Sequence, residues 1–180
     1  ALAERCDFER GHTEQVTKLS LRLFDELADL HELGGRERFW LRCGAMLHDI
    51  GYTQGRQGHH KTALRTVLDD RSIPFDERQR RIVASIARYH RKALPRESHA
   101  HFAALDDTDR RTVERLSGIL RIADGLDRTH CDRVADVHCD IAGKTVHIRC
   151  SLTGSAGAEF AAAAKKSDLF EQIFAKSVEF

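Results

Sequence analysis

The stretch AMLHDIGY, residues 45–52, ends a helical pattern of apolar residues with two polar side chains. The pattern predicts a helix over residues 36–48, and Gly51 breaks it. His48 and Asp49 therefore stand where a helix should enter a hydrophobic core. A neutral polar group buried without a partner costs about 2 to 7 kcal/mol, and a carboxylate costs more. We expect both side chains to share a binding partner.

Four further ionisable side chains extend apolar stripes of predicted helices: His12, His60, His90 and Asp124. Their spacing of about one turn from buried neighbours directs them inward. Taken singly, each histidine is more typical of a core residue bonded to a carbonyl, and Asp124 of an ion pair with Arg121 or Arg128. Taken together, six inward-facing groups at the ends of five helices favour a shared divalent cation.

The donor types narrow the choice of metal. Imidazole nitrogens and carboxylate oxygens without thiolates suit Mn, Fe, Co, Ni, Zn or Mg. Neighbouring side chains on a helix diverge by about 100°. His48 and Asp49 can therefore meet one ion only at its rim, with His12 and Asp124 completing the site.

Composition limits the protein class. The chain has 180 residues, 41% hydrophobic and 32% charged, with two prolines, which is typical of a helix-rich globular protein. It contains no apolar run near 18 residues and no basic-then-apolar leader, so we expect no membrane span, no signal peptide and a cytoplasmic location. Five cysteines without a C-x-x-C pair argue against a disulfide framework or a thiolate zinc site. A net charge of +1 indicates no specific nucleic-acid partner, and exposed apolar positions would allow a homodimer.

The hydrophobic periodicity predicts a mainly α fold. We expect residues 1–133 to form a helical metal-binding domain, with a first helix from about residue 14 or earlier to 30 and further helices at about 36–48, 60–68, 77–90 and within 106–130. Residues 134–180 form a small α+β appendage. Apolar residues alternate along residues 137–152 around Gly143, which predicts a β-hairpin, and residues 157–178 return to helix with a break near Ser167.

The pattern His12, then His48 and Asp49, then Asp124 resembles the H…HD…D signature of the HD-domain metal-dependent phosphohydrolases. The closest resemblance is to the C-terminal HD region of the exopolyphosphatase and guanosine pentaphosphate phosphatase family. Five blocks carry it in order: HTEQVTKLSLRLFDEL, AMLHDIGY, IARYHRKALP, LSGILRIADGLDR and KKSDLFEQIF. The resemblance implies an HD-type helical bundle in which these four residues bind one metal.

The resemblance also implies a second metal in some members, held by two further histidines and bridged by the HD aspartate. These histidines would be His60 and His90. His59 is the alternative to His60, which we prefer because it begins the stripe toward Leu64 and Leu68. In the family, hydrolysis of polyphosphate or guanosine pentaphosphate takes place in upstream actin-like domains, so that chemistry is not expected of these residues. Some HD proteins have a lysine directly after the HDIG motif, where this chain has Tyr52.

The implied function is a metal-dependent phosphohydrolase acting on a phosphorylated small molecule. Asp49 or Asp124 would orient the attacking water. Four basic residues are predicted to bind substrate phosphate: Arg88, Arg91, Lys92 and Arg128. We expect Arg78, Arg80 and Arg81 to form a solvated helix face. Two alternatives stay open: a non-catalytic module that binds polyphosphate or a nucleotide polyphosphate, and a di-iron oxygenase of HD type.

Overall fold

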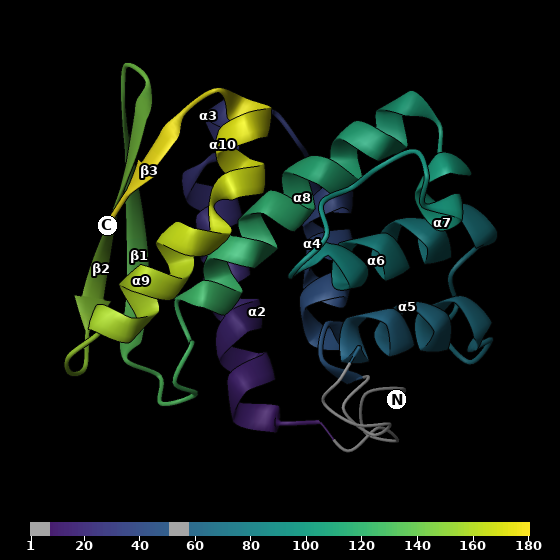
Figure 1. Ribbon diagram of the computed structural model, residues 1–180, viewed down its shortest axis with the longest axis horizontal. Coiled ribbons are helices and arrows are strands. Elements are labelled where there is room, and N and C mark those ends of the chain that lie inside the picture. Colours follow the sequence, from purple (N-terminus) through teal and green to yellow (C-terminus); the bar gives the residue numbers. More distant parts are fainter. Residues whose placement is uncertain (1–7, 51–57) are drawn as a thin grey trace.

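The computed structural model describes residues 8–50 and 58–180 (Figure 1). Within these residues the chain forms nine helices and one three-stranded sheet, so the predicted mainly α fold is confirmed. Cys6, Tyr52 and Gly51, the predicted break after the second helix, lie outside the described residues. No helix in the described part of the chain is both long and apolar enough to cross a membrane.

The first predicted helix is divided at Leu27. Helix α2 spans Arg10–Glu26 and the short helix α3 spans Ala28–His31. Helix α4 follows at Gly35–Leu47, within one residue of its predicted bounds. Leu27 is almost completely buried, and its N–H still donates to the carbonyl of Leu23. The two helices therefore keep their apolar residues in one core.

Helices α5 (His59–Asp69) and α6 (Glu77–Tyr89) pack against each other. Asp76 begins α6 through a capping box with Gln79, in which each side chain bonds the other residue's N–H. The expected solvated position of Arg80 was wrong: its side chain is buried and donates to carbonyls at the end of α5 and in the following loop. A buried guanidinium is tolerated there because those carbonyls have no helical N–H partner.

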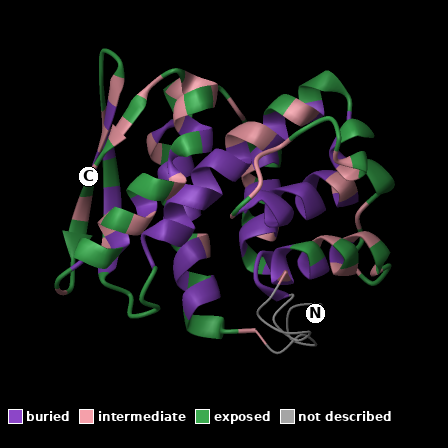
Figure 2. Cartoon of the chain, viewed as in Figure 1, coloured by how far each residue is buried: buried purple, intermediate pink, exposed green. Residues whose placement is uncertain are grey.

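Helix α8 (Asp107–Gly125) crosses the centre of the molecule, after the short helix α7 (Ala100–Ala103), which was not predicted (Figure 1). Most of its last half is buried (Figure 2). Helices α2, α4 and α6 contact it on one side, and α9 (Gly157–Lys166) and α10 (Asp168–Phe174) contact it on the other. The predicted break near Ser167 is confirmed, because Ser167 ends α9 and precedes α10.

The sheet contains the predicted hairpin and one strand that was not predicted. Strands β1 (Val134–Ala142) and β2 (Thr145–Leu152) are antiparallel, and the turn between them includes Gly143 at φ +57°. Strand β3 (Ser177–Glu179) runs parallel to β2. The division into two domains between residues 133 and 134 stays a prediction. Helices α9 and α10, which follow this boundary, pack directly on α8, which precedes it.

Candidate metal centre

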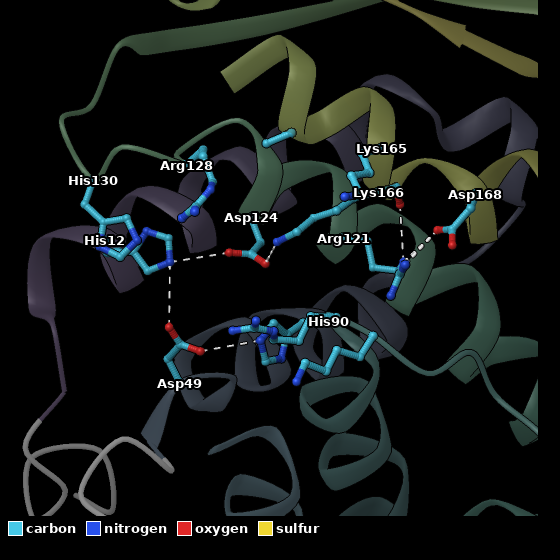
Figure 3. A pocket seen from close by; sticks show the side chains of 13 residues that line it. His12, Asp49, His90, Arg121, Asp124, Arg128, His130, Lys165, Lys166 and Asp168 are labelled. Atoms are coloured by element: carbon cyan, nitrogen blue, oxygen red, sulfur yellow. Dashed lines mark hydrogen bonds and ion pairs between the residues drawn. The ribbon is translucent and has the colours of Figure 1, made fainter. Parts of the chain in front are cut away.

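Most of the predicted ligands converge because each lies at an end of its helix. His12 lies in the first turn of α2, His48 caps the C-terminus of α4 with Asp49 next to it, His90 caps α6, and Asp124 lies in the last turn of α8. These ends meet at one pocket of about 490 Å³ (Figure 3). All five residues are buried, with at most 8% of their surface exposed.

Two groups of three donors share Asp49. The first group consists of His12, His48 and Asp49, and the second of Asp49, His59 and His90. Asp49 Oδ2 lies 3.6 Å from His48 Nε2 and 3.9 Å from His12 Nε2. Asp49 Oδ1 lies 3.2 Å from His59 Nε2 and 3.5 Å from His90 Nε2. Each group could hold one metal ion, and the Asp49 carboxylate would then lie between the two ions.

The ring orientations suit metal ligands. His48 Nδ1 donates to the Ala45 carbonyl at 2.6 Å, and His90 Nδ1 donates to the Ala87 carbonyl at 2.7 Å. These bonds place the proton on Nδ1 and leave the lone pair on Nε2, which faces Asp49. His48 Nε2 is buried and has no hydrogen-bond partner among residues 8–50 and 58–180. A buried acceptor in this position fits a cation, and so do the nitrogen and oxygen donor types.

Of the two neighbouring histidines, the structure brings His59 to Asp49 and leaves His60 outside both groups. The preference for His60 is not supported because the buried stripe of α5 runs through Ala63 and Val67, one and two turns after His59. The leucines that follow His60 are only partly buried. His60 is itself buried, and burial together with the charge of Arg88 lowers its pKa to about 4. Metal binding by His59 stays a prediction.

Asp124 lies beside the first group and does not belong to it. Its Oδ1 is 3.5 Å from His12 Nε2, and its Oδ2 contacts the ammonium of Lys166 at the end of α9. Arg121 and Arg128, the ion-pair partners considered for Asp124 in the sequence, do not form an ion pair with it: Lys166 takes this place, and Arg121 pairs with Asp168. Burial opposes ionisation of Asp124, but Lys166 and His12 outweigh it and hold its pKa well below the usual range.

His12 carries the strongest electrostatic perturbation of the first group. Its Nδ1 donates to Asp127 Oδ2 at 2.7 Å, and its Nε2 faces Asp49 and Asp124. Burial alone would lower the pKa of His12, but the carboxylates outweigh it and raise the pKa to about 10. Burial likewise opposes ionisation of Asp49, and the surrounding histidines reverse this and lower its pKa. The cluster is therefore built around negative charge.

Two residues of the site were missed in the sequence. Asp127 is fully buried and orients His12, as a carboxylate partner orients a metal-binding histidine. It follows the observed end of α8, but it lies four residues after the buried Ala123, so the stripe of the predicted helix could have indicated it. Lys166 lies in the appendage, 42 residues after Asp124. Its position in KKSDLFEQIF offered only a lysine in the last turn of a predicted helix.

The predicted phosphate-binding residues divide into two sets. Arg91, Lys92 and Arg128 line the pocket, and Lys92 has a left-handed backbone conformation with φ +60°. Arg88 is not among the lining residues; it is 6% exposed and lies over the ring of Tyr89. Helical geometry explains the difference, because residues two apart on α6 face different directions and His90 already faces the pocket.

One family model covers most of the chain. Residues 1–164 match the family model Ppx/GppA phosphatase, domain III. The match includes every residue of the two histidine groups and ends within α9. The chain belongs to the Ppx/GppA phosphatase family, of which these residues represent domain III.

Proposed function

We propose that this domain is a metal-dependent phosphohydrolase acting on a phosphorylated small molecule, either a nucleotide or a polyphosphate-like compound. The observation that carries the proposal is that Asp49 belongs to two buried histidine groups at once. A shared carboxylate with imidazole donors on both sides suits one or two divalent cations. Membership in a phosphatase family supports the class of reaction.

The two histidine groups would each bind one metal ion. His12, His48 and Asp49 would hold one ion, and Asp49, His59 and His90 a second. A bound divalent ion supplies a water of lowered pKa and neutralises charge that develops on the phosphoryl oxygens. Asp127 keeps Nε2 of His12 directed inward, and the carbonyls of α4 and α6 do the same for His48 and His90.

We assign the orientation of the attacking water to the two carboxylates of the site. Asp124 Oδ1 lies beside His12 and borders the pocket, and Asp49 lies between the histidine groups. A carboxylate held ionised at neutral pH can accept a proton or a hydrogen bond from water. The pKa values of both groups are lowered, so both are available in that form.

Substrate phosphates would bind at the basic rim of the pocket. Arg91, Lys92 and Arg128 border the same space as Asp49 and Asp124. Lys92 and Arg128 are exposed, and neither forms an ion pair with a described residue. Arginine can bind two phosphate oxygens with its planar fork of donors. The rim therefore offers uncommitted positive charge next to the candidate metal centre.

The first test is elemental analysis of protein purified without chelator or affinity metal, followed by phosphate release from an aryl phosphate and from nucleotides with added Mn. We expect bound divalent metal and phosphate release that Asp49→Ala abolishes. Asp69→Ala is the matched control, because Asp69 is an exposed carboxylate on α5 outside the pocket. Activity that survives Asp49→Ala would exclude the assignment.

A second candidate is a module that binds a polyphosphate or nucleotide polyphosphate without hydrolysing it. Lys92 and Arg128, which form no ion pair with the residues that the structure describes, would suit such binding. Salt-sensitive binding with no phosphate release across several metals would support this alternative. An HD-type di-iron oxygenase would use the same donors and would instead show an iron-dependent chromophore and oxygen consumption.

A further inference from the structure

Lys166 has a position that a simple surface ion pair does not explain. Its ammonium contacts Asp124 Oδ2, whereas the other oxygen of Asp124 faces His12. The lysine side chain is 23% exposed and lines the same pocket as Asp49 (Figure 3). A cation from the C-terminal segment is thereby placed directly beside the candidate metal centre.

Close packing of two helices brings Lys166 to this place. Gly125 is the last residue of α8, and a Cβ added there would lie 2.5 Å from Ala163 Cα and 2.7 Å from Ala163 N. Only glycine allows the α9 backbone to approach so closely. Ala163 lies three residues before Lys166, so this contact sets the distance between the lysine and Asp124.

Arg121 then fixes the end of α9. Its Nε donates to the Lys166 carbonyl at 3.2 Å, and its Nη2 donates to Asp168 Oδ1 at 2.7 Å. Its Nη1 donates to the Tyr89 carbonyl at 3.2 Å. One buried guanidinium thus joins the residue before His90 to the residue that faces Asp124. Arg121 is a positioning residue for both sides of the pocket.

The Lys166 ammonium has hydrogen-bond donors to spare. A lysine ammonium has three N–H donors. In the described part of the chain, Asp124 is the only side chain or carbonyl that Lys166 Nζ bonds. Two donors are left on a group that borders the pocket, next to a carboxylate that keeps it in place. This arrangement suits an oxygen-rich anion that lies between the rim and the metal centre.

We propose that Lys166 binds the phosphate group that is cleaved, and that α9 is therefore part of the active site. This inference rests on the proposed function and adds a residue from outside the predicted metal-binding segment. Asp124 would then connect the metal centre to the substrate, with Oδ1 toward the ligands and Oδ2 toward the substrate-binding lysine. Arg91, Lys92 and Arg128 would bind the remaining phosphates or the free end of the substrate.

The test measures binding of inorganic phosphate by calorimetry, with and without Mn, for the wild type and three variants. Lys166→Met removes the charge at similar length, and Lys166→Arg keeps it. Lys144→Met removes the same charge from the exposed hairpin turn, outside the pocket. Melting temperatures and Mn titrations are recorded for each protein, so that misfolding or metal loss is recognised.

We expect Lys166→Met to weaken phosphate binding at least tenfold, Lys166→Arg to restore most of it, and Lys144→Met to match the wild type. Mn affinity should not fall in Lys166→Met, because this change removes a competing cation from Asp124. Equal phosphate affinity in Lys166→Met and the wild type would overturn the inference, whether or not Mn binds. Failure of the wild type to bind Mn or any other divalent metal would overturn the proposed function separately.

Discussion

Gly125→Ala tests whether the close approach of α8 and α9 is required. The added Cβ would meet three backbone atoms, Ala163 Cα at 2.5 Å, Ala163 N at 2.7 Å and the Ala162 carbonyl carbon at 3.0 Å. Backbone atoms cannot rotate away as a side chain can. The helices must therefore separate or shift, and Lys166 must move with α9.

The expected magnitude follows from two opposing effects. Overpacking in a tight interior costs about 1 to 3 kcal/mol, and these contacts are shorter than real Cβ contacts, so the upper part of that range applies. Replacing glycine by alanine in a helix gains at most about 1 kcal/mol, and less at the last residue. The net change is a loss of about 2 kcal/mol, which for a chain of this length lowers the melting temperature by about 4 to 8 °C.

Gly11→Ala is the matched control for thermal unfolding. Gly11 lies in α2, and a Cβ added there would meet nothing within 4 Å, so the same chemical change should be neutral or slightly stabilising. Both variants and the wild type are melted under one condition, with phosphate affinity measured alongside. A Gly125→Ala protein that melts with the wild type and binds phosphate equally well would refute this account of the interface.

Two further predictions concern histidines. Asp127→Asn replaces the carboxylate that accepts from His12, and loss of such a partner should reduce Mn affinity by about 10- to 100-fold in a metal titration; unchanged affinity would contradict the role of Asp127. Burial, aided by the charges of His99 and Arg88, lowers the pKa of His101 to about 4. The unfolded chain then binds this proton from about pH 6.5 and the folded chain only near pH 4, so stability falls as pH drops through that window. Urea unfolding should show a shallower fall for His101→Gln than for the wild type, and identical slopes would exclude the effect.

Periodicity located the helices well because the core is built from stripes that the sequence displays. The predicted bounds of α4 differ from the observed ones by one residue at each end, and those of α6 by one residue at the C-terminal end only. Strand β3 was missed because no local pattern in the sequence indicates it. It has three residues and exists because it pairs with β2, a contact between distant segments that a local pattern cannot contain.

The choice between His59 and His60 shows why a stripe can mislead. Leu64 and Leu68 are the more hydrophobic residues, so they give His60 the stronger pattern. Packing, however, selects Ala63 and Val67 as the buried face, because α5 lies close against α6 and small side chains fit there. Hydrophobicity alone therefore does not identify the stripe of this helix that is fully buried, and the ligand choice between the two histidines stays a prediction.

Helix termini explain why AMLHDIGY ends in polar residues. The last four carbonyls of a helix have no N–H partner within it. Ala45 in α4 and Ala87 in α6 are such residues, and each accepts from the histidine three positions later. A histidine that caps a helix in this way satisfies the backbone with Nδ1 and directs Nε2 beyond the helix end. His48 and His90 repeat this arrangement on two helices whose ends meet at Asp49, so each histidine satisfies the backbone with one ring nitrogen and leaves the other for the proposed metal.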